Sequence, residues 1–86
     1  MIDVYLYTTQ LCPYCTQAKR LLETKGISYR EILVDGNAEL RMEMMTTSGR
    51  RTVPQIWVGE QHIGGCDDLY ALERSGQLDQ LLVPCV

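Results

Sequence analysis

A C-P-Y-C segment at residues 12–15 constrains the fold of this 86-residue chain more than any other feature. It follows an apolar, β-rich run over residues 2–7 and precedes a run over residues 16–24 whose apolar side chains recur at helical spacing. Pro13 suits the first turn of a helix, where its missing N–H costs nothing. The pattern therefore predicts a buried strand, a loop and a helix, with two cysteines at the junction of loop and helix.

Cysteines at the start of a helix have distinctive chemistry. A thiol there faces backbone N–H groups without intrahelical partners and the positive end of the helix dipole. Both favour the thiolate, which is the nucleophilic form of cysteine. We predict that Cys12, which precedes the helix, is the attacking thiolate and that Cys15, one turn along, is the resolving thiol. Such a pair can carry out thiol–disulfide exchange.

Composition and charge narrow the class of protein. The length predicts one domain over residues 1–86. A net charge of -3 argues against a nucleic-acid partner and mildly against anionic membranes. No apolar run approaches the roughly 20 residues of a membrane span, and residues 1–7 lack the basic start of a signal peptide, so we expect a cytoplasmic protein. The 4 cysteines then indicate a redox or metal role rather than a disulfide framework.

Turn and cap residues predict the remaining elements. Strands are expected over residues 27–34, 53–58 and 62–63, with a loop over residues 8–11. Helices are expected from a cap at Gly36 or Asn37 to Gly49, from Asp67 or Asp68 to Gly76, and from Leu78 to Pro84. A helix between the first two strands requires a parallel pair, and the later hairpin adds two antiparallel strands. We therefore predict an α/β protein of thioredoxin fold, with a mixed four-stranded sheet (βαβαββα plus a short C-terminal helix) and helices on both faces.

A C-x-x-C segment can also be half of a zinc site, which needs four ligands. The other ligands would have to come from His62, Cys66 or Cys85, and these residues form no second pair at ligand spacing. We therefore favour the redox interpretation and expect no metal.

A proline at the start of the third predicted strand marks a second candidate site. Sheets tolerate proline there, so strand geometry alone could explain Pro54. The functional interpretation is a cis bond between Val53 and Pro54. It would leave the Val53 backbone to pair with an extended thiol peptide, as in strand addition, and hold the sulfur of that peptide near Cys12.

The G-G-C-D-D segment at residues 64–68 is the third candidate site. Two glycines allow close backbone approach, and the helix N-terminus that follows suits a carboxylate. Asp67 and Asp68 could meet an ammonium group, so the end of an α-amino acid would fit. The structural alternative is a capped helix with two favourable N-terminal aspartates.

Together, C-P-Y-C, the T-V-P of residues 52–54 and G-G-C-D-D resemble the dithiol glutaredoxins. The resemblance extends over essentially the whole chain, and residues 34–37, 48–50 and 62–72 are closest to a small bacterial type of that family. It implies a glutathione-dependent thiol–disulfide oxidoreductase. Such an enzyme reduces protein disulfides and protein–glutathione mixed disulfides.

The resemblance also implies a glutathione site, position by position. Cys12 would form the mixed disulfide with the glutathione sulfur, and Val53 would pair with the cysteinyl unit. Arg41 and Arg51 stand where the family places groups that meet the glycine carboxylate, although solvated surface charge explains them equally well. The expected glutathione-binding residues are Tyr14, Arg41, Arg51, Thr52, Val53, Pro54, Gly65, Cys66, Asp67 and Asp68.

The implied partners are glutathione as co-substrate and disulfide-containing or glutathionylated proteins, with ribonucleotide reductase among the plausible ones, and we expect a monomer. Two rival functions stay open. One is an iron–sulfur cluster carrier, which some glutaredoxins are, but Pro13 in place of glycine argues against it. The other is a redoxin linked to thioredoxin reductase. The G-G-C-D-D segment and the arginines argue against that.

One position departs from the family pattern and gives a first prediction. Many members carry lysine three residues before the first cysteine, where this chain has Thr9. A neighbouring ammonium group favours the thiolate, so Thr9→Lys should raise the thiolate fraction of Cys12 at neutral pH. Titration of the ultraviolet thiolate absorbance in both proteins measures this fraction. An equal or lower fraction in Thr9→Lys would contradict the argument.

Overall fold

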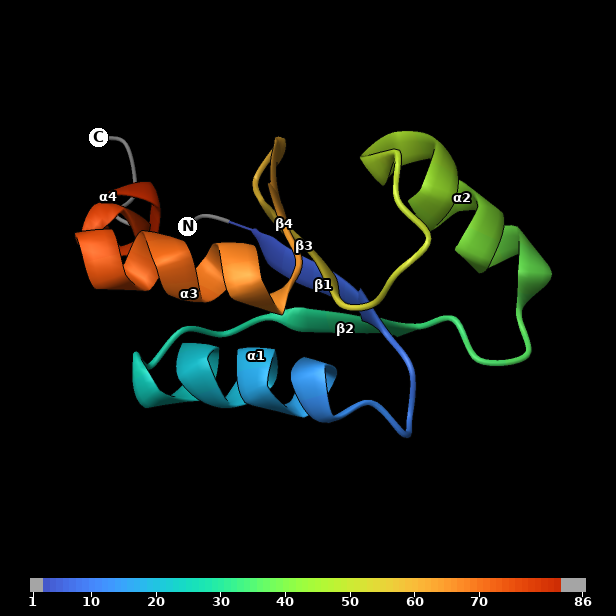
Figure 1. Cartoon of the computed structure of the whole chain (residues 1–86), viewed down its shortest axis with the longest axis horizontal. Coiled ribbons are helices and arrows are strands. Elements are labelled where there is room, and N and C mark those ends of the chain that lie inside the picture. The colour runs from blue at the N-terminus through green and yellow to red at the C-terminus, as the bar shows by residue number, and fades with distance from the viewer. Residues whose placement is uncertain (1–2, 83–86) are drawn as a thin grey trace.

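The computed structural model describes residues 3–82 of the chain (Figure 1). Its elements follow the predicted order. They are β1 (Val4–Thr8), α1 (Pro13–Thr24), β2 (Arg30–Leu33), α2 (Ala38–Ser48), β3 (Gln55–Val58), β4 (Gln61–Gly64), α3 (Cys66–Ser75) and α4 (Gln77–Leu82). The predicted stop at Pro84 and the cysteine at position 85 lie outside the described residues.

The four strands form one mixed sheet in the order β2-β1-β3-β4. β1 is parallel to β2 and antiparallel to β3, and β4 continues from β3 as an antiparallel hairpin. In this register Tyr7 lies beside Gln55, and Ile56 lies beside Gly64. The predicted mixed four-stranded sheet is confirmed.

Successive side chains of β1 point to opposite faces of the sheet and divide the core in two. Leu6 belongs to a cluster that includes Leu22 of α1 and Leu69 of α3, all three fully buried. Tyr7 belongs to a second cluster with Met44 of α2. Figure 1 shows α1 and α3 together, with α2 set apart from them. Helices therefore cover both faces of the sheet, as predicted.

Local chemistry explains where several elements begin and end. Asn37 caps α2, since its side-chain oxygen accepts the Leu40 N–H at 3.1 Å, and Gly49 ends the helix in the left-handed conformation. Thr8 was predicted to begin a loop, which is wrong: it is the last residue of β1. Its side chain is fully buried, and its hydroxyl donates to Glu31 of β2 at 2.6 Å.

The start of α3 also differs from the prediction. Gly65, and neither Asp67 nor Asp68, is the N-cap residue. Asp68 occupies the third helical position, from which its carboxylate reaches back to accept the Gly65 N–H at 2.9 Å. A single carboxylate therefore fixes the turn from β4 into α3.

Gly64, at the end of β4, gives a stability prediction. Its φ of 118° is disfavoured for other residues, and an added Cβ would collide with the Asp68 carboxylate. Gly64→Ala should therefore lower the free energy of unfolding by more than about 2 kcal/mol. Gly59→Ala is the matched control, because Gly59 has a φ of 61° and open space around it. Urea unfolding of both variants provides the comparison, and equal losses would argue against the collision.

Candidate active site

Cys12 occupies the N-cap position of α1 in extended conformation, with φ of -138° and ψ of 103°. Its Sγ accepts the backbone N–H of Cys15 at 3.1 Å, which is a contact that favours the negatively charged sulfur. In the thiol form Cys12 donates to the carbonyl oxygen of Val53 at 3.8 Å. The half-buried sulfur therefore lies between the start of α1 and the loop before β3, where the sequence predicted it.

Cys15 has the opposite environment, although it lies only one turn away. Its side chain is 1% exposed. Burial, reinforced by the hydrogen bond with Cys12, raises the pKa of the Cys15 thiol to about 12. Cys15 is therefore protonated at neutral pH while Cys12 faces solvent, so the two thiols are equipped for successive rather than simultaneous attack.

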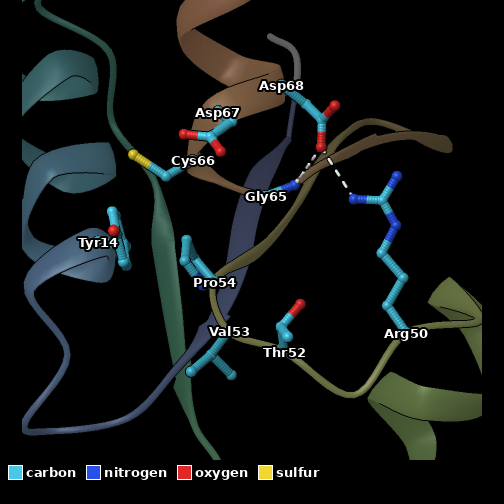
Figure 2. A pocket seen from close by; sticks show the side chains of 9 residues that line it. All are labelled: Tyr14, Arg50, Thr52, Val53, Pro54, Gly65, Cys66, Asp67 and Asp68. Carbon is cyan, nitrogen blue, oxygen red and sulfur yellow. Dashed lines mark hydrogen bonds and ion pairs between the residues drawn. The ribbon is translucent and has the colours of Figure 1, made fainter.

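A cavity of about 260 Å³ lies next to this pair (Figure 2). The N-terminal part of α1, the loop before β3 and the start of α3 supply its walls. Its lining residues are Tyr14, Arg50, Thr52, Val53, Pro54, Gly65, Cys66, Asp67 and Asp68. Eight of these nine belong to the set predicted from sequence, so segments distant in the chain meet as expected.

The middle wall of the cavity is the loop over residues 52–54. The peptide bond between Val53 and Pro54 is cis, as predicted. Across from it, an added Cβ at Gly65 would come within 3.4 Å of the Pro54 carbonyl oxygen. Gly65 therefore allows the start of α3 to lie directly against this loop.

Charged groups at the mouth of the cavity are arranged around Asp68. Its Oδ2 accepts both the Gly65 N–H and the Nη1 of Arg50, each at 2.9 Å, and Figure 2 shows both bonds. Arg50 foremost, and then the Gly65 N–H, lower the pKa of the Asp68 carboxyl. The other oxygen, Oδ1, has no hydrogen-bond partner among residues 3–82 and is available to a cationic ligand group.

The structure places Arg50, rather than Arg41 or Arg51, on the cavity wall. Sequence reasoning did not select Arg50, because a loop has no periodicity that distinguishes two consecutive arginines. The position of Arg50 depends on the contact of this loop with Asp68 of α3, which the local sequence does not show. Cys66 is buried, and burial raises the pKa of its thiol.

Between positions 3 and 82, no group of three or more histidine, cysteine, aspartate or glutamate side chains is arranged to hold a metal ion. Within that range, no helix has the length and apolar character needed to cross a bilayer.

Comparison with known proteins agrees with the resemblance seen in the motifs. The glutaredoxin family model matches residues 4–63. Glutaredoxin 3 of Escherichia coli K12 is 58% identical over 82 residues, covering 95% of this chain and 99% of that protein. A glutaredoxin of Pseudomonas aeruginosa is also 58% identical, covering 95% of this chain and 98% of that protein.

Solved structures show the same thioredoxin-like fold. The solution structure of a glutaredoxin from Brucella melitensis has a TM-score of 0.85 and 56% identity, covering 95% of this chain and 89% of that one. The crystal structure of a buckwheat glutaredoxin–glutathione complex has a TM-score of 0.87 and 30% identity, covering 94% of this chain and 76% of that one. The predicted fold is therefore confirmed.

The Arg50–Asp68 pair gives a prediction about pH. Arg50→Ala should raise the pKa of Asp68 toward its ordinary value of about 3.9, because the guanidinium is the main cause of the lowered value. Carboxyl carbon NMR titration measures this pKa. Arg51→Ala is the matched control and should leave it unchanged, since Arg51 makes no ion pair with Asp68. Equal shifts in the two variants would contradict the assignment.

The same pair has a consequence for stability. Because folding lowers the pKa of Asp68, its ionised carboxylate stabilises the fold at pH values above the pKa that this group has in the unfolded chain. The contribution is lost as the pH falls through the lower pKa of the folded state. The stability difference between wild type and Arg50→Ala should therefore be larger at neutral pH than in acid. It should stay below about 1 kcal/mol, because solvent screens both half-exposed side chains.

Proposed function

This chain belongs to the glutaredoxin family, and we propose that it uses glutathione to reduce protein–glutathione mixed disulfides and protein disulfides through Cys12 and Cys15. Membership of the family makes it a glutathione-linked thiol–disulfide oxidoreductase. The observation that carries the finer proposal is the position of the Cys12 sulfur, which lies at the start of α1 and contacts the Val53 wall of the cavity.

The cavity has groups that match each part of glutathione. Among residues 3–82 the Val53 N–H donates to no acceptor, so the Val53 backbone can pair with the cysteinyl unit. The first N–H groups of α3 can bind the γ-glutamyl carboxylate, and Asp67 with the Oδ1 of Asp68 can bind its ammonium group. Tyr14, which is 59% exposed, can flank the sulfur.

The glycine carboxylate of glutathione is the part farthest from α3 in this arrangement. Arg41 and Arg51 remain the proposed residues for it, although they lie outside the cavity lining. The buckwheat glutaredoxin–glutathione complex supports the overall placement, because that fold matches this one over 94% of the chain.

Reduction of a glutathionylated protein needs only Cys12. The Cys12 thiolate attacks the glutathione sulfur, the disulfide breaks, and the protein leaves as a thiolate that takes up a proton. A second glutathione, as thiolate, then attacks the glutathione sulfur bound to Cys12. Glutathione disulfide leaves and the Cys12 thiolate is restored, stabilised by the Cys15 N–H.

Reduction of a protein disulfide needs both cysteines. Cys12 attacks one sulfur of the substrate and forms a mixed disulfide, which removes the negative charge from Cys12. That charge contributes to the raised pKa of Cys15, so its removal assists loss of the Cys15 proton. Cys15 then attacks the Cys12 sulfur and releases the reduced protein, and two glutathione molecules reduce the new disulfide. Ribonucleotide reductase is one proposed substrate of this route.

Two substitutions separate these routes. Cys15→Ser should retain most of the activity on a glutathionylated peptide and lose the reduction of a protein disulfide, whereas Cys12→Ser should reduce both activities to the uncatalysed rate. Formation of glutathione disulfide, coupled to glutathione reductase, measures both. Substantial activity in Cys12→Ser would overturn the assignment of the nucleophile. Turnover with thioredoxin reductase in place of glutathione would overturn the choice of reductant.

A further inference from the structure

Gln55 is an unusual residue for the first position of β3, because its polar side chain is fully buried. Its Nε2 donates to the carbonyl oxygen of Thr52 at 3.0 Å and to the Thr52 hydroxyl oxygen at 3.2 Å. Its Oε1 lies 2.8 Å from Nε2 of His62 on the neighbouring strand β4. One amide group therefore joins the hairpin partner strand to the loop that forms the cavity wall.

The chemistry of these atoms fixes the direction of every bond. The Thr52 carbonyl can only accept, so the amide nitrogen of Gln55 must face it and the amide oxygen must face His62. His62 therefore carries its hydrogen on Nε2 and donates it to Gln55. Burial, and then the charge of Arg50, lower the pKa of His62 and favour the neutral ring, whose Nδ1 is unprotonated.

The imidazole of His62 is itself held in place. Its ring lies 4.6 Å from that of Trp57, centre to centre, and Trp57 is buried in the cluster beneath α2. His62 therefore presents its Nε2–H to Gln55 from a fixed position rather than from a mobile surface side chain.

The hydrogen bonds that run from His62 through Gln55 to Thr52 form a relay, and this relay ends at the cavity. Thr52 lines it, and Figure 2 shows Thr52 next to Val53 on the same loop. Because the Thr52 oxygen accepts from Gln55, its own hydrogen is free to point elsewhere and can be donated to a ligand. The Val53 carbonyl that follows contacts the Cys12 thiol, so the position of this loop sets the distance between ligand backbone and nucleophile.

We propose that His62 is a positioning residue for the glutathione site: through Gln55 it holds Thr52 and the Val53 backbone where the ligand pairs, and it keeps the Thr52 hydroxyl hydrogen available to the ligand. The proposal rests on the proposed function. Without His62, the buried Oε1 of Gln55 loses its donor. The Thr52 hydroxyl lies 3.2 Å from the Gln55 amide nitrogen, and an amide turned to accept from this hydroxyl would withdraw its hydrogen from the cavity.

The kinetic test uses His62→Leu and His62→Gln with a glutathionylated peptide as substrate. His62→Leu should raise KM about 5-fold with little change in kcat, as expected for one lost hydrogen bond that acts on binding. His62→Gln keeps an N–H donor at the position of Nε2 and should restore most of the affinity. An unchanged KM in His62→Leu, or no recovery in His62→Gln, would overturn the proposal.

A matched control separates positioning from simple loss of stability. Ile63 is the next residue of β4 and packs on the opposite face of the sheet, away from Gln55. Ile63→Ala should lower the free energy of unfolding while leaving KM unchanged. A KM increase in Ile63→Ala equal to that in His62→Leu would show that the relay has only a structural role.

A second measurement does not depend on activity. Nitrogen-15 NMR of His62 in the wild-type protein should show a protonated Nε2 and an unprotonated Nδ1 at neutral pH. The reverse tautomer would overturn the bond directions and with them the proposal. If the wild-type protein failed to turn over the glutathionylated peptide, the proposed function would fail, and the tautomer would still report on the relay by itself.

Discussion

The antiparallel pairing of β3 with β1 is the constraint on which the site depends. It places Gln55 beside Tyr7, so the loop that precedes β3 lies next to the loop that leaves β1 and carries Cys12. The β3–β4 hairpin then returns Gly64 to a position beside Ile56 and directs α3 toward the same edge. Three segments that are far apart in the sequence meet there because backbone pairing allows no other register without moving apolar side chains out of the core.

Once these segments meet, the local surroundings give the two cysteine thiols different properties. Cys12 and Cys15 have the same thiol, but one faces solvent and accepts a backbone N–H, while the other is buried with its pKa raised to about 12. The difference comes from where α1 begins, since the cap residue is outside the helix and the residue three positions later turns into the core. The different environments of the attacking and the resolving cysteine therefore follow from helix geometry.

Polar side chains then hold the 50–54 segment, which strand pairing alone does not fix in position. Asp68 ties Gly65 and Arg50 together at the cavity wall, and Gln55 ties Thr52 to His62. Both links join the 50–54 segment to β4 or α3. The loop whose Val53 carbonyl contacts the Cys12 thiol is therefore held by two separate links, which suits a site that must present backbone groups to a peptide in a fixed position.

Much of this protein was predictable from its sequence because the signals are local. The order of elements, a helix that begins near Asn37, the cysteines at a helix start and the cis bond at Pro54 depend on neighbours in the chain. The family resemblance implied eight of the cavity residues. Tertiary structure decided the rest: that Arg50 rather than Arg51 faces Asp68, that Thr8 stays in the sheet, and that Gln55 links His62 to Thr52. Each of these depends on the register between strands, and register is set by packing of the whole core, which no short stretch of sequence contains.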